Sequence, residues 1–89
     1  MYNFSERFRK HIEGDGYLDR DKLQRRIAIR LKSVCHKQKI SQSKLSEMSG
    51  ISRETLNRCF NGNRMPDVFT LACIANALNI STDYLIFGQ

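Results

Sequence analysis

The segment from Ser52 to Asn61 carries side chains whose hydrogen-bonding groups match the edges of nucleic-acid bases. Arginine donates to O6 and N7 of guanine, asparagine pairs with N6 and N7 of adenine, and glutamate accepts from N4 of cytosine. On a helix with about 100° between residues, the polar side chains fall within an arc of about 140°. They are Arg53, Glu54, Asn57, Arg58 and Asn61. An ordinary amphipathic helix, with Glu54 and Arg58 as a surface ion pair, would show the same arrangement.

The positive charge of the chain is concentrated in its middle half. The 89 residues hold 15 lysines and arginines against nine aspartates and glutamates, a formal net charge of +6. Residues 23–66 contain ten of the basic residues and two of the acids, which gives +8. Residues 1–22 balance five against five, and residues 67–89 contain only two acids. This excess favours a polyanionic partner, because each lysine or arginine that meets a phosphate releases condensed counterions. A solvated basic face would have the same composition.

Neither the cysteines nor the histidines form a metal-binding or catalytic pattern. Cys35, Cys59 and Cys73 are an odd number without a CxxC pair, and their spacing matches neither a disulfide framework nor a zinc site. We expect each to be a small buried hydrophobic residue. His11 and His36 have no second ligand at helical spacing. The sequence also lacks a glycine-rich phosphate loop and a nucleophile with a nearby base, so we expect no metal, no cofactor and no enzymatic activity.

Apolar residues recur at helical spacing, and no stretch alternates as a half-buried strand does. The longest predicted helix starts at Asp19 or Asp21, either of which suits an N-cap, and its inward residues are Leu23, Ile27, Leu31, Val34 and Cys35. Shorter helices follow the caps Ser41, Ser52, Asp67 and Ser81. Their inward residues are Leu45 and Met48, then Leu56 and Phe60, then Leu71, Ile74, Ala75 and Leu78, and the last turn runs through Tyr84, Leu85 and Phe87. The sequence predicts an all-α fold.

A tight turn separates the helices that follow Ser41 and Ser52. Gly50 suits the left-handed conformation that ends a helix and lets the chain reverse sharply. Two short helices joined in this way make a helix-turn-helix unit, in which the second helix enters the major groove of DNA and the first lies across the backbone. We therefore expect a bracing helix at about residues 42–49 and a reading helix at about residues 53–61.

A pattern distributed over some forty positions surrounds this unit. It comprises Ile40, Ser41, Gln42, Ser43, Lys44, Leu45, Ser46, Gly50, Ile51, Ser52, Leu56, Phe60, Asn61, Gly62, Pro66, Leu71, Ile74, Ala75, Ala77, Leu78, Asn79, Ile80, Ser81, Tyr84 and Leu85. The pattern resembles the Cro/CI-type helix-turn-helix family of phage repressors and bacterial XRE-like regulators, over about residues 23–88. The resemblance implies a five-helix, lambda-repressor-like DNA-binding domain at residues 23–89, here with an extra short N-terminal helical segment.

The resemblance also implies two groups of DNA-contacting residues. The base-reading positions are Arg53, Glu54, Asn57 and Arg58. The positions that hold the DNA backbone are Gln42, Ser43, Lys44, Asn61, Asn63 and Arg64, the last three in or beside the loop after the reading helix. One departure is Ser46, where the family usually has alanine. Its hydroxyl must bond back to a carbonyl or lie at the edge of the helix contact.

Residues 1–22 lie outside the family pattern but hold four of the eight aromatic residues. Phe4, Phe8 and Ile12 repeat at helical spacing ahead of a turn at residues 14–16. We expect a short helix and turn that either packs on the core or contributes to a dimer interface. In the second case the far end of the chain would add Tyr84, Ile86 and Phe87.

The resemblance implies a sequence-specific transcriptional regulator of double-stranded DNA. Most such proteins are repressors that bind a palindromic operator as homodimers through the major groove, with half-sites about 34 Å apart. Two alternatives remain open. One is an antitoxin that autoregulates through the same unit while another surface neutralises a toxin, and the other is a restriction-modification controller protein. A protein partner, either a toxin or a co-regulator, is also left open, and the aromatic N-terminal segment or a small protein bound in stoichiometric amount would favour the antitoxin.

The sequence gives no sign of a membrane partner. No apolar run approaches the roughly 20 residues that span a bilayer, and residues 1–10 lack the apolar region and cleavage site of a secretory signal. We expect a cytoplasmic protein of a bacterial or phage-infected cell, associated with the nucleoid.

Overall fold

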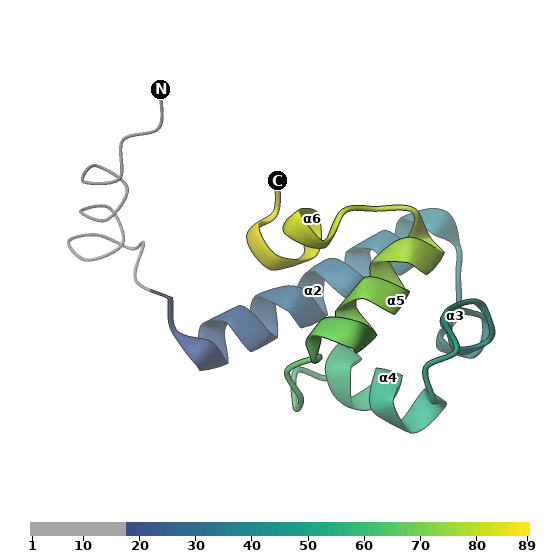
Figure 1. The fold of residues 1–89 in the computed structure, drawn as a ribbon, viewed down its shortest axis with the longest axis horizontal. Helices are drawn as coiled ribbons and strands as arrows, with labels where there is room; N and C mark the ends of the chain where they lie inside the picture. Colours follow the sequence, from purple (N-terminus) through teal and green to yellow (C-terminus); the bar gives the residue numbers. More distant parts are fainter. Residues whose placement is uncertain (1–17) are drawn as a thin grey trace.

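The computed structural model describes residues 18–89, which form five helices and no strand (Figure 1). The helices are α2 (Arg20–Gln38), α3 (Gln42–Ser49), α4 (Arg53–Phe60), α5 (Val68–Leu78) and α6 (Thr82–Phe87). The all-helical prediction is therefore confirmed. The helix expected around Phe4, Phe8 and Ile12, and the turn after it, lie outside the described residues.

Every helix begins at a residue whose side chain accepts a hydrogen bond from the backbone amide three residues later. The five N-caps are Asp19, Ser41, Ser52, Asp67 and Ser81. Such a bond satisfies one of the amides that a helix leaves unpaired in its first turn. At Asp19 and Asp67 the amide hydrogen bond also lowers the pKa of the carboxyl group, because it stabilises the charged form. Four of these helices begin at the predicted cap, and for α2 the structure selects Asp19 from the two candidates, Asp19 and Asp21.

The long helix α2 supports the other elements (Figure 1). It packs against α4 and α6, while α3 packs against α4 and α5. The centre of the core is made of side chains without solvent contact, contributed by all five helices: Leu31, Leu45, Leu56, Ile74, Leu78 and Leu85. Leu56, together with Cys59 and Phe60, anchors α4 in the core, and the residues on the opposite side of that helix remain at the surface.

Met48 was expected to point inward, and this prediction is wrong. Its exposed fraction is 44%, whereas Leu45 on the same helix is fully buried. The inward side of α3 is completed by Ser46 and Ser49, which are both partly buried. Relative to Leu45 these serines lie on one side of the helix and Met48 lies on the other. A helix of eight residues gives too few apolar positions to fix the direction of its buried face.

The cysteines are free thiols. Cys35 and Cys59 are buried as expected, and burial raises the pKa of both thiols because the charged form loses solvation. Cys73 is only partly buried. Among residues 18–89, no helix is both long enough and apolar enough to pass through a membrane.

Candidate nucleic-acid interface

Helices α3 and α4 are joined by Gly50, Ile51 and Ser52. Gly50 ends α3 with φ of 77°, and its amide donates to the carbonyl of Ser46 at 2.9 Å. A left-handed residue at this position turns the chain sharply, as the sequence predicted. Ile51 is buried in the core, so the turn is held from inside. The two short helices are thereby fixed at one relative orientation.

Two serine hydroxyls of α3 hold the turn in addition. The Ser46 hydroxyl donates to the carbonyl of Ile51 at 2.6 Å. The Ser49 hydroxyl donates to the carbonyl of Leu45 at 2.7 Å and accepts from the Ile51 amide at 3.2 Å. The Ser46 hydroxyl was expected either to bond back to a carbonyl or to lie at the edge of the helix contact. It does bond to a carbonyl, but the partner lies five residues ahead instead of one helical turn behind. The serine at the position where the family usually has alanine therefore fastens the turn.

Helix α4 has two different sides. Leu56, Cys59 and Phe60 are buried against the rest of the protein. All four residues at the predicted base-reading positions are exposed on the opposite side: Arg53, Glu54, Asn57 and Arg58. Asn61, which follows the helix as its C-cap, is exposed as well. The structure therefore brings the predicted base-reading residues together on one solvent-facing surface.

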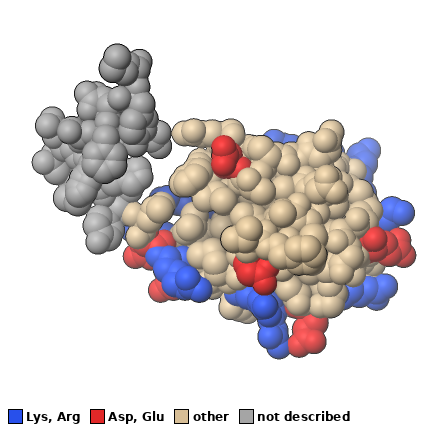
Figure 2. All heavy atoms as spheres, in the orientation of Figure 1, with Lys and Arg blue, Asp and Glu red and all other residues tan. Residues whose placement is uncertain are grey.

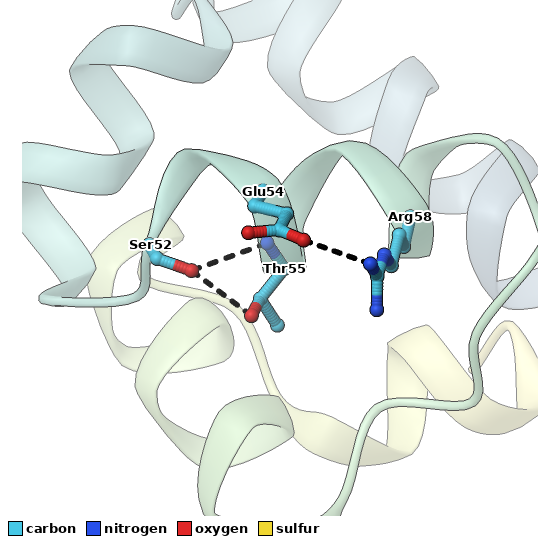
Figure 3. A network of polar contacts seen from close by, with 4 residues as sticks. All are labelled: Ser52, Glu54, Thr55 and Arg58. Atoms are coloured by element: carbon cyan, nitrogen blue, oxygen red, sulfur yellow. Dashed lines mark hydrogen bonds and ion pairs between the residues drawn. The ribbon is translucent and has the colours of Figure 1, made fainter.

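Most of the polar groups on this surface bond to one another. Nη2 of Arg58 lies 2.7 Å from Oε1 of Glu54, so these residues form an ion pair (Figure 3). Nδ2 of Asn61 donates to Oδ1 of Asn57 at 2.9 Å. Arg53 makes no ion pair or side-chain hydrogen bond within residues 18–89. Within the described part of the chain, the outward side of α4 thus combines one cation without a partner, Arg53, with two pairs of side chains that bond to each other.

The start of α4 is fixed by a local network. The Ser52 hydroxyl accepts from the Thr55 amide at 3.2 Å and donates to the Thr55 hydroxyl at 3.0 Å (Figure 3). These contacts define where the first turn begins. They consequently set the position of Arg53, the first residue of the helix, relative to the turn.

The predicted backbone-binding residues flank α4 on both sides. Gln42 opens α3 and is partly buried, while Ser43 and Lys44 beside it are exposed. Nζ of Lys44 lies 3.7 Å from Oε2 of Glu47, a loose contact between two exposed side chains. On the other side, Asn61, Asn63 and Arg64 are all exposed.

In the loop after α4, side chains are more available to a ligand than backbone amides are, because the first amides already donate hydrogen bonds within the protein. The amides of Asn61, Gly62 and Asn63 donate to carbonyls of the last turns of α4. Sequence reasoning could not identify the anchor of this loop, which is on α2: Nε2 of Gln24 donates to the Gly62 carbonyl at 2.7 Å. The side-chain stem of Arg25 also lies beside Gly62. Arg25 is therefore a further cation next to the loop, and only the folded chain reveals this.

Not every basic residue of the middle segment is available to a polyanion. Nη1 of Arg30 donates to the carbonyls of Leu85 and Ile86 at 3.1 and 2.8 Å, so this arginine holds the end of α6. Helices α5 and α6 contain no lysine or arginine and one acid, Asp83. Accordingly, the lysine and arginine side chains lie around the edges of the face shown in Figure 2, and its middle is largely uncharged.

Comparison with known proteins agrees with this geometry. The family model described as helix-turn-helix matches residues 31–85, from the middle of α2 into α6. A protein of Bacillus subtilis (strain 168) named "Uncharacterized HTH-type transcriptional regulator YqaE" is 39% identical over 56 residues. The match covers 62% of this chain and 48% of the relative, so the chain spans about half the length of that protein. The resemblance found in the sequence is confirmed: the chain belongs to the helix-turn-helix family.

Proposed function

We propose that this chain is a sequence-specific regulator of transcription that inserts α4 into the major groove of double-stranded DNA. The observation that carries the proposal is the composition of the outward side of α4. Arg53, Glu54, Asn57 and Arg58 are all exposed there, above an anchor of buried apolar residues. A helix attached by one side and carrying base-matching groups on the other fits a groove about 12 Å wide.

The residues around α4 suit contacts with phosphates. Gln42, Ser43 and Lys44 project from the first turn of α3, and Asn61, Asn63 and Arg64 follow the end of α4. Contacts on both sides of the inserted helix would fix its register in the groove without reading sequence themselves. The exposed cations of α2, among them Arg25 beside the loop, add charge that attracts the DNA backbone.

The regulatory part of the proposal is supported by the printed name of the relative, an HTH-type transcriptional regulator. A domain that covers an operator can exclude other proteins from the same DNA. We therefore propose repression as the mode of action.

We further propose that two copies bind a palindromic operator. Two-fold related half-sites lie about 34 Å apart, and a dimer places one reading helix in each. The surface of α5 and α6 supports this, because these helices carry no lysine or arginine and two positively charged copies repel each other least there. Three apolar residues stand out on these helices: Val68 is 85% exposed, Phe69 is 72% exposed and Phe87 is 52% exposed. Adjacent exposed apolar side chains, such as Val68 and Phe69 at the start of α5, can form the apolar patch that an interaction surface requires.

Selection of bound duplexes from a random DNA pool tests the proposal. We expect enrichment of one sequence with two-fold symmetry, and sedimentation equilibrium should give a dimer at tens of micromolar protein or on the selected duplex. Failure to enrich any sequence would contradict sequence-specific binding. An asymmetric sequence bound by a monomer would contradict only the palindrome and the dimer.

A further inference from the structure

The ion pair on α4 leaves hydrogen-bonding groups free on both of its members. The 2.7 Å contact joins Nη2 of Arg58 to Oε1 of Glu54. It occupies one of the five N–H groups of a guanidinium and one of the two oxygens of a carboxylate. The two charged groups lie beside each other along the helix (Figure 3), and their side chains are 55% exposed for Arg58 and 75% exposed for Glu54. The remaining donors of Arg58 and the second oxygen of Glu54 are therefore open to one external partner.

This pair is complementary to the major-groove edge of a G·C base pair. Guanine presents the acceptors O6 and N7, and cytosine beside it presents the N4 amino group as a donor. The ion pair presents the reverse order, donors from Arg58 beside an acceptor from Glu54. No other base pair places two acceptors of one base next to a lone amino donor of its partner.

If Glu54 and Arg58 contacted the bases independently, they would contact different base pairs. Residues four apart are separated by about 6 Å along the helix axis, which corresponds to about two base steps of 3.4 Å. An unpaired Glu54 would also bring a carboxylate toward the phosphates without compensation, and the repulsion would weaken binding to every sequence. Pairing with Arg58 removes that net charge while both groups face the bases.

We propose that Glu54 and Arg58 stay paired on DNA and read a single G·C base pair as one unit. Arg58 donates to guanine, and Glu54 accepts one hydrogen bond from Arg58 and another from N4 of cytosine. Glu54 is then both a specificity-determining residue and the group that positions Arg58. This inference rests on the proposed function, since it assumes that α4 faces the bases.

The test measures base preference for Glu54→Gln, Arg58→Ala and the double variant. The duplex selected by the wild-type protein is compared with duplexes in which each G·C base pair is replaced in turn. Glutamine keeps the size of the side chain but has an amino group in place of one carboxylate oxygen, so it no longer offers one acceptor oxygen to each of its two neighbours. We expect each single variant to lose about 5- to 150-fold of discrimination at the same base pair. The double variant should lose no more than the worse single variant.

Glu47→Gln is the matched control. Glu47 also faces a cation at helical spacing, Lys44 at 3.7 Å, and its replacement changes the net charge by the same amount. It should strengthen binding to all duplexes alike and leave base preference unchanged. Thermal unfolding followed by circular dichroism verifies that each variant is folded, as expected for exposed side chains.

Each result decides the question. The joint reading is supported if both single variants lose discrimination at the same base pair and the double variant loses no more than the worse of the two. Losses at two base pairs about two steps apart that do multiply overturn it. Unchanged discrimination in the variants, when the wild-type protein does select a sequence, overturns it as well. If the wild-type protein selects no sequence at all, the proposed function itself fails, which is a separate and recognisable outcome.

Discussion

Replacing Arg53 with alanine should separate DNA recognition from stability. Arg53 is the first residue of α4, its side chain is exposed, and it has no ion-pair or side-chain hydrogen-bond partner within the described residues. A cation at this end of a helix faces the positive end of the helix dipole. Removing it should leave the free energy of unfolding unchanged or raise it by about 0.3 kcal/mol, the low end of the range for exposed sites. A purely structural role would give the opposite sign.

Binding should change far more than stability. Loss of one bidentate base contact costs about 1–3 kcal/mol, which is about 5- to 150-fold in affinity for the selected duplex. The assay is fluorescence anisotropy with the selected duplex and with variants at each base pair, at two salt concentrations. Urea denaturation of the same preparations gives the stability. We expect Arg53→Ala to lose discrimination at one or two adjacent base pairs.

Arg20→Ala provides a matched control. Arg20 is the first residue of α2 and is exposed, so the change removes the same side chain from the same helical position. It should have a similar small effect on stability and none on base preference. If Arg53→Ala retains full discrimination, or if its loss of binding follows a loss of stability, the assignment of α4 as the reading helix is refuted.

Three further predictions concern the loop, the turn and a helix cap. Arg64→Ala should weaken binding to all duplexes by a similar factor and reduce the slope of log affinity against log salt by about one. Anisotropy titrations measure both effects. A loss of affinity confined to particular base pairs would argue against a phosphate contact. Ser46→Ala removes the 2.6 Å hydrogen bond to the Ile51 carbonyl and should lower the free energy of unfolding by about 0.5–1.5 kcal/mol, as measured by urea denaturation. Equal or greater stability of the variant would show that this bond does not stabilise the turn. The cap Asp67 has a pKa below its ordinary value, so its stabilisation is present above about pH 4 and is lost as the pH falls through the folded-state pKa. Asp67→Asn retains a capping oxygen but does not titrate. The stability of the wild type relative to this variant should therefore be constant above about pH 5 and decrease in acid. A stability difference independent of pH down to about pH 2 would contradict the hydrogen bond to the Thr70 amide as the cause of the lowered pKa.

Local interactions account for what the sequence predicted well. An N-cap involves one side chain and an amide three residues away, so residue types alone predicted the starts of four helices and narrowed the start of α2 to Asp19 or Asp21. The exposed and buried sides of α4 followed from helical periodicity, because the apolar and polar groups lie nearly opposite each other. The end of α4 at Phe60, one residue before the predicted limit, is a difference of the size expected at a frayed helix terminus.

Contacts between distant segments account for what the sequence did not predict. Arg30 contributes to the basic excess of the middle segment, yet it bonds to carbonyls 55 and 56 residues away. Gln24 holds the loop after α4 across 38 residues. Neither contact leaves a periodic signal, since each depends on how α2 crosses the other helices. The prediction for Met48 was wrong for the same reason, because the packing of α3 against α4 and α5 decides which side of α3 is buried.

The position of α4 on DNA can be measured most directly by intermolecular nuclear Overhauser effects in a complex with the selected duplex. Contact with the bases predicts effects between the side chains of Arg53 or Asn57 and major-groove protons, such as cytosine H5 and thymine methyl groups. Lys44 and Arg64 should then show effects to sugar protons only. If the effects to base protons came from another helix, or if α4 gave none, the outward side of α4 would not be the surface that reads DNA.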